Sequence, residues 1–269
     1  MNAIDFHAHA FPDALAKRAI ATLEAGCPWK AFGDGTVSAL LASMDAAGVD
    51  VSAVCPIATR PGQEAGILKW CREIRSSRIV PLPSVHPDSP DAVKWIDAIA
   101  DEGFTGVKLH PMYQQFAFDE QRVDPIYQAA RRRGIFIAAH CGLDIAYPPD
   151  DDRADPRRFR RVLDRHEGLM LVCTHMGGWR AWDLSMKYLV GQAVYLETSM
   201  SLAELGPQRA ADMIRRHGPD RVMFGTDWPW DRQKEQVQAV VQLGLSDEDT
   251  GKILRSNAAK LLKCPPCMP

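Results

Sequence analysis

The sequence has no apolar run long enough to cross a membrane and no concentration of positive charge. No stretch approaches the roughly 18 apolar residues that a membrane-spanning helix needs. The formal net charge of −2 argues against nucleic-acid binding through a basic surface. Asp5, His7 and His9 stand where a signal peptide would carry its basic and apolar segments. We therefore expect a cytoplasmic protein that acts on a small molecule, without a nucleic acid or a membrane as partner.

The cysteines do not show the spacing of a disulfide framework or of a structural zinc site. Their number, seven, is odd and their spacing is irregular, which favours reduced thiols in a chain of this size. Cys264 and Cys267 form a C-x-x-C pair near the end of the sequence without a second pair, so we interpret them as part of a tail. The G-x-G-x-x-G pattern that often follows the first strand of dinucleotide-binding folds is also missing.

Segments typical of β-strands alternate with segments typical of helices along the whole sequence. This alternation predicts a parallel α/β sheet. Eight strand–helix units in 269 residues fit a single (β/α)8 TIM-type barrel domain over residues 1–269, with an open doubly wound sheet as the alternative. The eight predicted strands are 4–9, 49–57, 78–85, 104–111, 135–140, 169–175, 193–198 and 221–226.

Three of the predicted helices have clear boundaries in the sequence. Thr36 can cap a helix that ends at Gly48, because threonine is a favoured N-cap and glycine a favoured C-terminal stop. A second helix is predicted over 124–133, before Gly134. A third is predicted as one continuous helix over 203–217.

Six of the eight histidines fall at the ends of predicted strands, where a (β/α)8 barrel has its functional groups. His7 and His9 are two residues apart on one strand and therefore share a face, although alone they fit a metal site and a hydrogen-bonded pair equally well. Asp227 follows the eighth strand. Six imidazoles and a carboxylate at one rim predict a metal site more strongly than separately hydrogen-bonded histidines. The six are His7, His9, His86, His110, His140 and His175.

At this point the sequence resembles the amidohydrolase superfamily, and within it the branch related to aminocarboxymuconate-semialdehyde decarboxylase. Each matching motif is weak alone, but together they follow the family's order over nearly the whole chain. The motifs are His-Ala-His-Ala-Phe-Pro at 7–12, Gly-Val-Lys-Leu-His-Pro at 106–111, His-Cys-Gly at 140–142, Thr-His-Met-Gly-Gly at 174–178, Phe-Gly-Thr-Asp-Trp-Pro at 224–229 and Asn-Ala-Ala-Lys-Leu-Leu at 257–262.

The resemblance implies one divalent metal, with zinc expected. Its ligands would be His7, His9, His140 and Asp227, and His175 would act beside them as an acid or base on metal-bound water. Imidazole and carboxylate ligands suit zinc, which brings the pKa of bound water to about 7.

A second metal is the alternative to this single-metal site. In some amidohydrolases a carboxylated lysine bridges two metals, which here would involve Lys108 and make His175 a ligand. His110 shares a strand face with Lys108, and it either joins such a site or lines the substrate pocket.

The substrate-binding residues are expected in the loops after the strands. Arg60, Tyr113, Arg180 and Trp228 could bind a carboxylate or an aromatic ring, and each also fits simple loop packing. Glu197, near the end of the seventh strand, is a candidate support for the ligands. A homodimer is compatible with the sequence.

The reaction favoured by the sequence is hydrolysis. Metal-activated water would attack a small, carboxylated amide, ester or lactone, and Asp227 or His175 would pass the proton to the leaving group as a catalytic residue. The compact chain with short connections favours this reaction. The alternative is a nonoxidative, metal-dependent decarboxylase of an aromatic or muconate-type acid. A non-catalytic binding barrel is disfavoured by the complete ligand set. A TatD-type nuclease would be expected to offer a glutamate where the middle strands here offer Lys108 and histidines.

Overall fold

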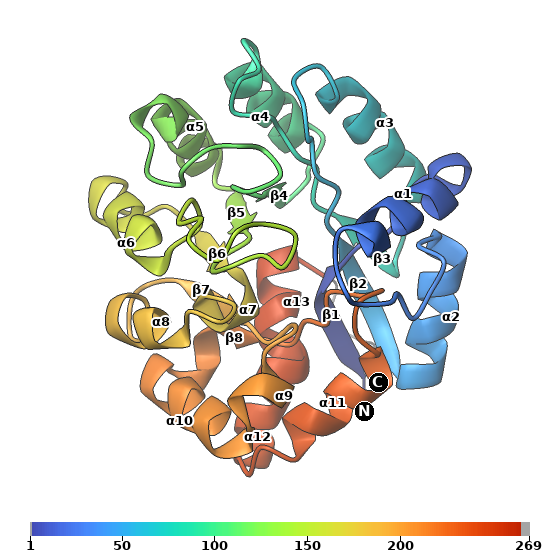
Figure 1. Cartoon of the computed structure of the whole chain (residues 1–269), viewed down its shortest axis with the longest axis vertical. Helices are drawn as coiled ribbons and strands as arrows, with labels where there is room; N and C mark the ends of the chain where they lie inside the picture. The colour runs from blue at the N-terminus through green and yellow to red at the C-terminus, as the bar shows by residue number, and fades with distance from the viewer. Residues whose placement is uncertain (1, 265–269) are drawn as a thin grey trace. The chain divides into compact units, whose positions relative to one another are not determined.

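The computed structural model describes residues 2–264, and contacts between residues divide the chain into two compact units. Unit 1 takes in the chain up to residue 54, residues 76–80 and the chain from residue 197 onward. Unit 2 consists of residues 55–75 and 81–196. Figure 1 labels the helices and strands of both. Cys267 of the predicted tail lies outside the described residues.

Unit 1 is built on a parallel sheet around β1. β1 pairs in parallel with β2 and is bonded on its other side to the segment at and after β8, where the Phe6 amide donates to the Phe224 carbonyl over 2.8 Å. Every residue of β1 is buried. The elements of this unit are β1 (Ala3–Ala8), α1 (Asp13–Ala25), α2 (Val37–Ala47), β2 (Val49–Val54), most of β3 (Ile79–Pro81), α9 (Leu202–Leu205), α10 (Pro207–His217), η2 (Pro219–Arg221), β8 (Val222–Met223), α11 (Gln233–Val241), α12 (Asp247–Gly251), the π-helical turn η3 (Lys252–Ser256) and α13 (Asn257–Leu262).

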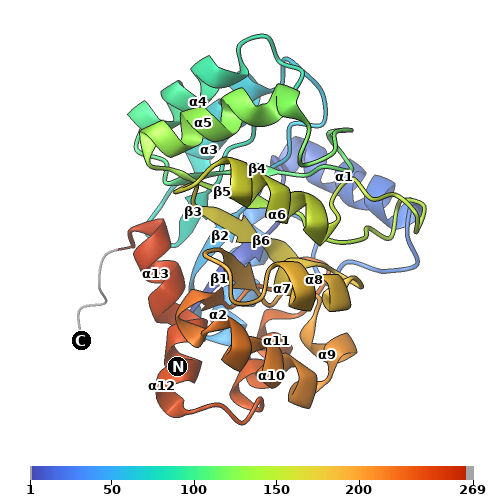
Figure 2. The same cartoon turned by 90° about the vertical axis from the view of Figure 1, so that its left-hand side faces the viewer.

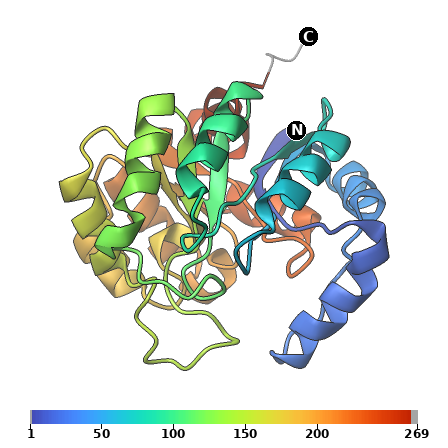
Figure 3. The same cartoon turned by 90° about the horizontal axis from the view of Figure 1, so that it is seen from above.

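Unit 2 has four parallel strands in the order β4-β5-β6-β7. Its core is formed by buried apolar side chains of the strands and of the helices packed on them. Figure 3 shows α4 and α5 running beside each other. The elements are α3 (Glu64–Ile74), α4 (Ala92–Asp101), β4 (Gly106–Leu109), η1 (Gln121–Val123), α5 (Asp124–Arg133), β5 (Phe136–Ala139), α6 (Pro156–Arg165), β6 (Leu171–Cys173), α7 (Thr174–Gly177), α8 (Trp182–Tyr188) and β7 (Tyr195–Glu197), whose last residue belongs to unit 1.

Two of the predicted helix boundaries are confirmed, and one predicted helix is interrupted. Thr36 caps α2, with its hydroxyl accepting from the Ala39 amide over 3.1 Å, and Gly48 ends the helix at φ +69°. The predicted continuous helix over 203–217 is wrong, because the chain forms α9 and α10 with a break at Gly206 (Figure 2). Gly206 has φ +73° and ψ +155°, and Pro207 begins α10 at a position where its missing amide proton costs nothing.

The strands are shorter than predicted at their carboxyl ends. β6 stops at Cys173 and β8 at Met223, although the sequence predicts strands to residues 175 and 226. His175 (φ +58°) and Asp227 (φ +63°) adopt left-handed backbone conformations just beyond these strands. Such conformations are costly for non-glycine residues and concentrate at functional sites. The predicted catalytic residues therefore lie on turns held by the strand ends.

No helix among the described residues has both the length and the apolar character to cross a bilayer.

Candidate metal centre

Unit 1 brings three of the predicted metal ligands together. The Nε2 atoms of His7 and His9 lie 3.1 Å apart, and each faces Oδ1 of Asp227, at 3.3 Å and 3.0 Å. Bonds of about 2.1 Å at tetrahedral or octahedral angles place neighbouring ligand atoms about 3.0–3.4 Å apart. Two imidazole nitrogens and a carboxylate oxygen at these separations therefore fit a divalent metal.

The orientation of His7 is fixed by Glu197. Nδ1 of His7 lies 3.1 Å from Oε1 of Glu197, and both side chains are buried, at 2% and 0% exposure. The carboxylate accepts a hydrogen bond from Nδ1–H, which leaves the lone pair of Nε2 facing His9 and Asp227. A carboxylate behind a ligating imidazole holds the ring and raises its basicity. The supporting role expected for Glu197 thus has a specific geometry.

Ser199 and Gly225 hold Glu197 in place. The Ser199 amide donates to Oε2 of Glu197 over 2.7 Å, and its hydroxyl donates to Oε1 over 2.7 Å. A Cβ at Gly225 would overlap Oε2 of Glu197, so only glycine lets the segment after β8 approach the carboxylate. Neither Ser199 nor Gly225 was predicted to support the ligands, although Gly225 lies in the motif at 224–229.

A buried carboxylate, Asp5, lies beneath the histidine pair. It accepts hydrogen bonds from the Thr226 hydroxyl over 2.6 Å, the Gln233 amide over 2.8 Å and the His7 backbone over 3.1 Å. Burial raises the pKa of Asp5 to about 7, although these hydrogen bonds act to lower it. Asp5 ties the turn after β8 to β1 and so positions Asp227 relative to His7. The sequence offered one signal for this role of Asp5, which is a charged residue inside a predicted strand.

Unit 2 carries the other two predicted centre residues, His140 and His175. Nε2 of His140 lies 2.9 Å from the Leu143 carbonyl, so Nε2 carries the proton and Nδ1 carries the lone pair. Nδ1 of His140 faces Nε2 of His175 over 3.1 Å. His140 thus has a tautomer that is compatible with metal binding through Nδ1, and His175 contacts the same nitrogen. The ligand role of His140 and the acid–base role of His175 stay predictions.

His110 belongs to a stack of rings beside His140. Its ring lies 4.2 Å from that of His140 at an interplanar angle of 15°, and its Nε2 is 3.4 Å from Oδ2 of Asp144. Stacked imidazoles direct their nitrogen lone pairs side by side, so they do not converge on one ion even though both rings and Asp144 lie close together. Tyr113 contacts His110 edge-on at 4.5 Å. This arrangement favours lining of a site over metal binding for His110.

The remaining predicted site residues differ widely in exposure. Lys108 is fully buried in β4, and the two-metal alternative that involves it stays a prediction. Arg60 is exposed, and Arg180 is exposed with its guanidinium 4.2 Å from the Trp179 ring. Trp228 is only 1% exposed, and a Cβ at Gly33 would overlap its ring.

Two of the buried side chains near the strand ends, Trp228 and His86, have surroundings typical of structural residues. Trp228 has the packing of a core residue, and substrate binding stays a prediction for it and for the two arginines. His86 accepts from the Asp88 amide over 3.1 Å, and burial lowers its pKa. That arrangement matches a hydrogen-bonded strand-end histidine.

The chain matches a known protein family over nearly its whole length. The family model described as amidohydrolase matches residues 4–264. The chain is 31% identical over 119 residues to the gamma-resorcylate decarboxylase of Rhodococcus jostii (strain RHA1). That match covers 38% of this chain, and it spans only about a third, 36%, of the relative's length.

Similar solved structures match nearly the whole chain. An uncharacterised TIM-barrel protein from Bordetella bronchiseptica has a TM-score of 0.76 at 19% identity, covering 98% of this chain and 99% of that one. The 5-carboxyvanillate decarboxylase of Novosphingobium aromaticivorans, complexed with manganese and 4-hydroxy-3-methoxy-5-nitrobenzoic acid, has a TM-score of 0.73 at 16% identity. That match covers 97% and 96% of the two chains. At these identities the likeness shows the fold, which is the predicted TIM-type α/β fold.

Proposed function

The chain belongs to the amidohydrolase family, and we propose that it is a metal-dependent, nonoxidative decarboxylase of a hydroxylated aromatic acid. The observation that carries this proposal is the cluster of His7, His9 and Asp227, whose ligand atoms are spaced for one divalent cation. The relatives direct the choice of reaction, because both the curated relative and a similar solved structure are named as decarboxylases of such acids. Hydrolysis, which the sequence favours, stays a prediction.

The residues fit either zinc or manganese. His7, His9 and Asp227 would hold the ion, with His140 as the expected fourth ligand through Nδ1. Neutral imidazoles favour zinc, while a carboxylate among them also accommodates manganese, the metal in the Novosphingobium structure. When bound, the cation would supply a Lewis acid for the oxygens of the substrate.

The protein's own contribution is to orient the ligands and to move one proton. Glu197 holds the proton of His7 on Nδ1 and so leaves the lone pair on Nε2. The Leu143 carbonyl holds the proton of His140 on Nε2 and so leaves the lone pair on Nδ1. His175 is the proposed proton donor, because its Nε2 lies beside Nδ1 of His140 and imidazole exchanges protons near neutral pH.

The proposed reaction balances with that single proton. A hydroxyl on the ring raises the electron density of the carbon that bears the carboxylate. That carbon takes a proton from His175, the bond to the carboxylate then breaks, and its electron pair returns to the ring as carbon dioxide leaves. Water returns the proton to His175, and the hydroxide that remains carries the negative charge of the consumed carboxylate. No oxidant or reductant is needed.

A substrate panel tests the proposal directly. The purified chain, loaded separately with zinc and with manganese, would be assayed for carbon dioxide release from 2,6-dihydroxybenzoate and 5-carboxyvanillate. The same preparations would be assayed on a panel of amides, esters and lactones of small carboxylic acids. We expect carbon dioxide release that a chelator abolishes and fresh metal restores. Hydrolysis of the second panel without any carbon dioxide from the first would replace decarboxylation with hydrolysis.

A further inference from the structure

A cavity of about 330 Å³ lies in unit 2 along α5 and beside the end of α6. Its volume is within the range of small-molecule sites. None of its lining residues is among the predicted metal ligands or substrate-binding residues. The lining consists of Asp124, Gln128, Arg131, Arg132, Arg165 and His166.

The charges in this cavity are unbalanced. Three guanidinium groups face it against a single carboxylate, Asp124. Oδ1 of Asp124 is already occupied, with Nε2 of His166 at 2.9 Å and Nη2 of Arg165 at 3.0 Å. The carboxylate therefore holds Arg165 and His166 in position and leaves the other two arginines without a nearby counter-charge in the lining.

Arg131 and Arg132 have unused hydrogen-bonding capacity. Arg131 donates through Nη1 to the Glu167 carbonyl over 2.8 Å, which fixes the guanidinium while its other donors stay available. For the exposed Arg132 side chain, the structure shows no ion pair or hydrogen bond with any residue from 2 to 264. Their place in the last turn of α5 favours cations through the helix dipole, but this effect is small at an exposed surface.

His166 contributes a buried ring to the wall of the same site. Its side chain is only 6% exposed and contacts the Tyr127 ring edge-on at 5.4 Å. Its Nε2 faces Asp124, which holds the ring in place. A small group of concentrated negative charge would therefore meet guanidinium donors on two helices, beside this ring.

We propose that this cavity binds the phosphate group of a small molecule, at a site separate from the metal centre. Guanidinium groups present paired N–H donors that match the oxygens of a phosphate dianion. Two adjacent arginines from α5 and one from α6 can surround such a group, and the dianion would neutralise the two excess positive charges that three guanidiniums and one carboxylate leave.

Calorimetry on the metal-loaded full chain tests this site. Inorganic phosphate, pyrophosphate and adenosine monophosphate serve as the probes, in a buffer without other multivalent anions. The test variant is Arg131→Gln with Arg132→Gln. The matched control is Arg215→Gln with Arg216→Gln, which are also adjacent arginines in the last turn of a helix, where Arg215 likewise donates to a carbonyl, that of Gly244, over 3.0 Å.

We expect saturable binding of at least one probe, weakened at least tenfold in the α5 variant and unchanged in the control. The probe that binds most tightly then shows whether the phosphate group bound at this site belongs to inorganic phosphate or to a nucleotide. Phosphate that binds the catalytic metal instead would be unaffected by both substitutions, so equal binding by all three proteins overturns the proposal. Absence of saturable binding of all three probes also overturns it.

Discussion

Oε1 of Glu197 lies 3.1 Å from Nδ1 of His7, while Nε2 of the same ring lies 3.3 Å from Oδ1 of Asp227. One imidazole thus joins a buried carboxylate on one side to the candidate metal position on the other. This arrangement fixes the tautomer of His7 before any metal binds, and it makes Glu197 a residue whose effect on the metal is testable.

Replacing Glu197 by glutamine should weaken metal binding about 10- to 100-fold, because the carboxylate that holds the Nδ1 proton is lost. Competition with a coloured chelator measures this affinity directly. Glu248→Gln on the surface of α12, where the side chain is 77% exposed, is the matched control and should bind metal like the wild type. Equal affinity of both variants would contradict the supporting role of Glu197.

Gly225→Ala should destabilise the protein by about 1–3 kcal/mol, because the added methyl group overlaps the Glu197 carboxylate in a packed environment. The displaced carboxylate should also lower metal affinity. Urea unfolding of the metal-free protein and chelator competition measure the two effects separately. Gly251→Ala, where a Cβ meets nothing within 4 Å, is the control. Wild-type metal affinity in Gly225→Ala would show that Glu197 does not depend on this close approach.

His175→Asn should lower kcat at least about 100-fold while leaving the metal content at one equivalent, because the proton donor is lost and the ligands are not. Elemental analysis and steady-state kinetics on the same preparation measure both quantities. His86→Asn serves as a control, since His86 makes a hydrogen bond to the Asp88 amide typical of a structural histidine. A fall in bound metal in His175→Asn would indicate that His175 is itself a ligand.

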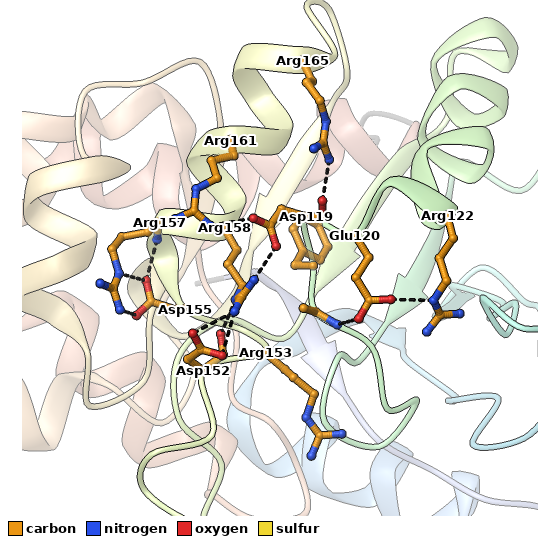
Figure 4. Close-up of polar contacts among 12 residues, drawn as sticks. Asp119, Glu120, Arg122, Asp152, Arg153, Asp155, Arg157, Arg158, Arg161 and Arg165 are labelled. Carbon is orange, nitrogen blue, oxygen red and sulfur yellow. Dashed lines mark hydrogen bonds and ion pairs between the residues drawn. The ribbon is translucent and has the colours of Figure 1, made fainter.

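Asp119 connects the segment after β4 to α6 and should give an acid-dependent contribution to stability. It accepts from Nη1 of Arg158 and of Arg161, each over 2.6 Å (Figure 4). Burial alone would raise the pKa of Asp119, but the two arginines outweigh it and lower the pKa. A lowered folded-state pKa stabilises the protein above the unfolded-state value, about 4, and this stabilisation is lost as pH falls through the folded-state value.

Asp119→Asn should therefore destabilise the protein by about 1–3 kcal/mol at pH 7, with the difference from wild type shrinking as the pH falls below about 4. Denaturant unfolding at a series of pH values measures this. Asp212→Asn removes an exposed i,i+4 pair with Arg216 and should cost about 0.5 kcal/mol or less. A destabilisation by Asp119→Asn that stays constant from pH 7 to pH 3 would rule out the charge as its cause.

Most of the helices and strands were predictable from the sequence because they depend on local patterns. The spacing of His7 and His9 predicted that their rings meet, which they do although β1 ends at Ala8, and Thr36 and Gly48 are boundary residues by their chemistry. The break at Gly206 was missed because a glycine inside a helical pattern is tolerated in many helices, and only its φ and ψ values show that it ends one here.

The supports of the candidate centre could not be predicted in the same way. Asp5, Ser199 and Gly225 act through partners far away in the sequence, such as Thr226 for Asp5 and Glu197 for Gly225. Their roles depend on which strands are neighbours and on how closely they approach. The stacking of His110 on His140, which disfavours a shared metal, likewise depends on ring orientation, on which the sequence carries no information.

A crystal structure of the manganese-loaded protein, with anomalous diffraction data collected at the manganese edge, tests the central claim most directly. We predict one anomalous peak per chain, bonded to Nε2 of His7, Nε2 of His9 and Oδ1 of Asp227, with Nδ1 of His140 as the further protein ligand. A peak bound by other residues, two peaks bridged by Lys108, or full catalytic activity in a preparation free of metal would contradict the account.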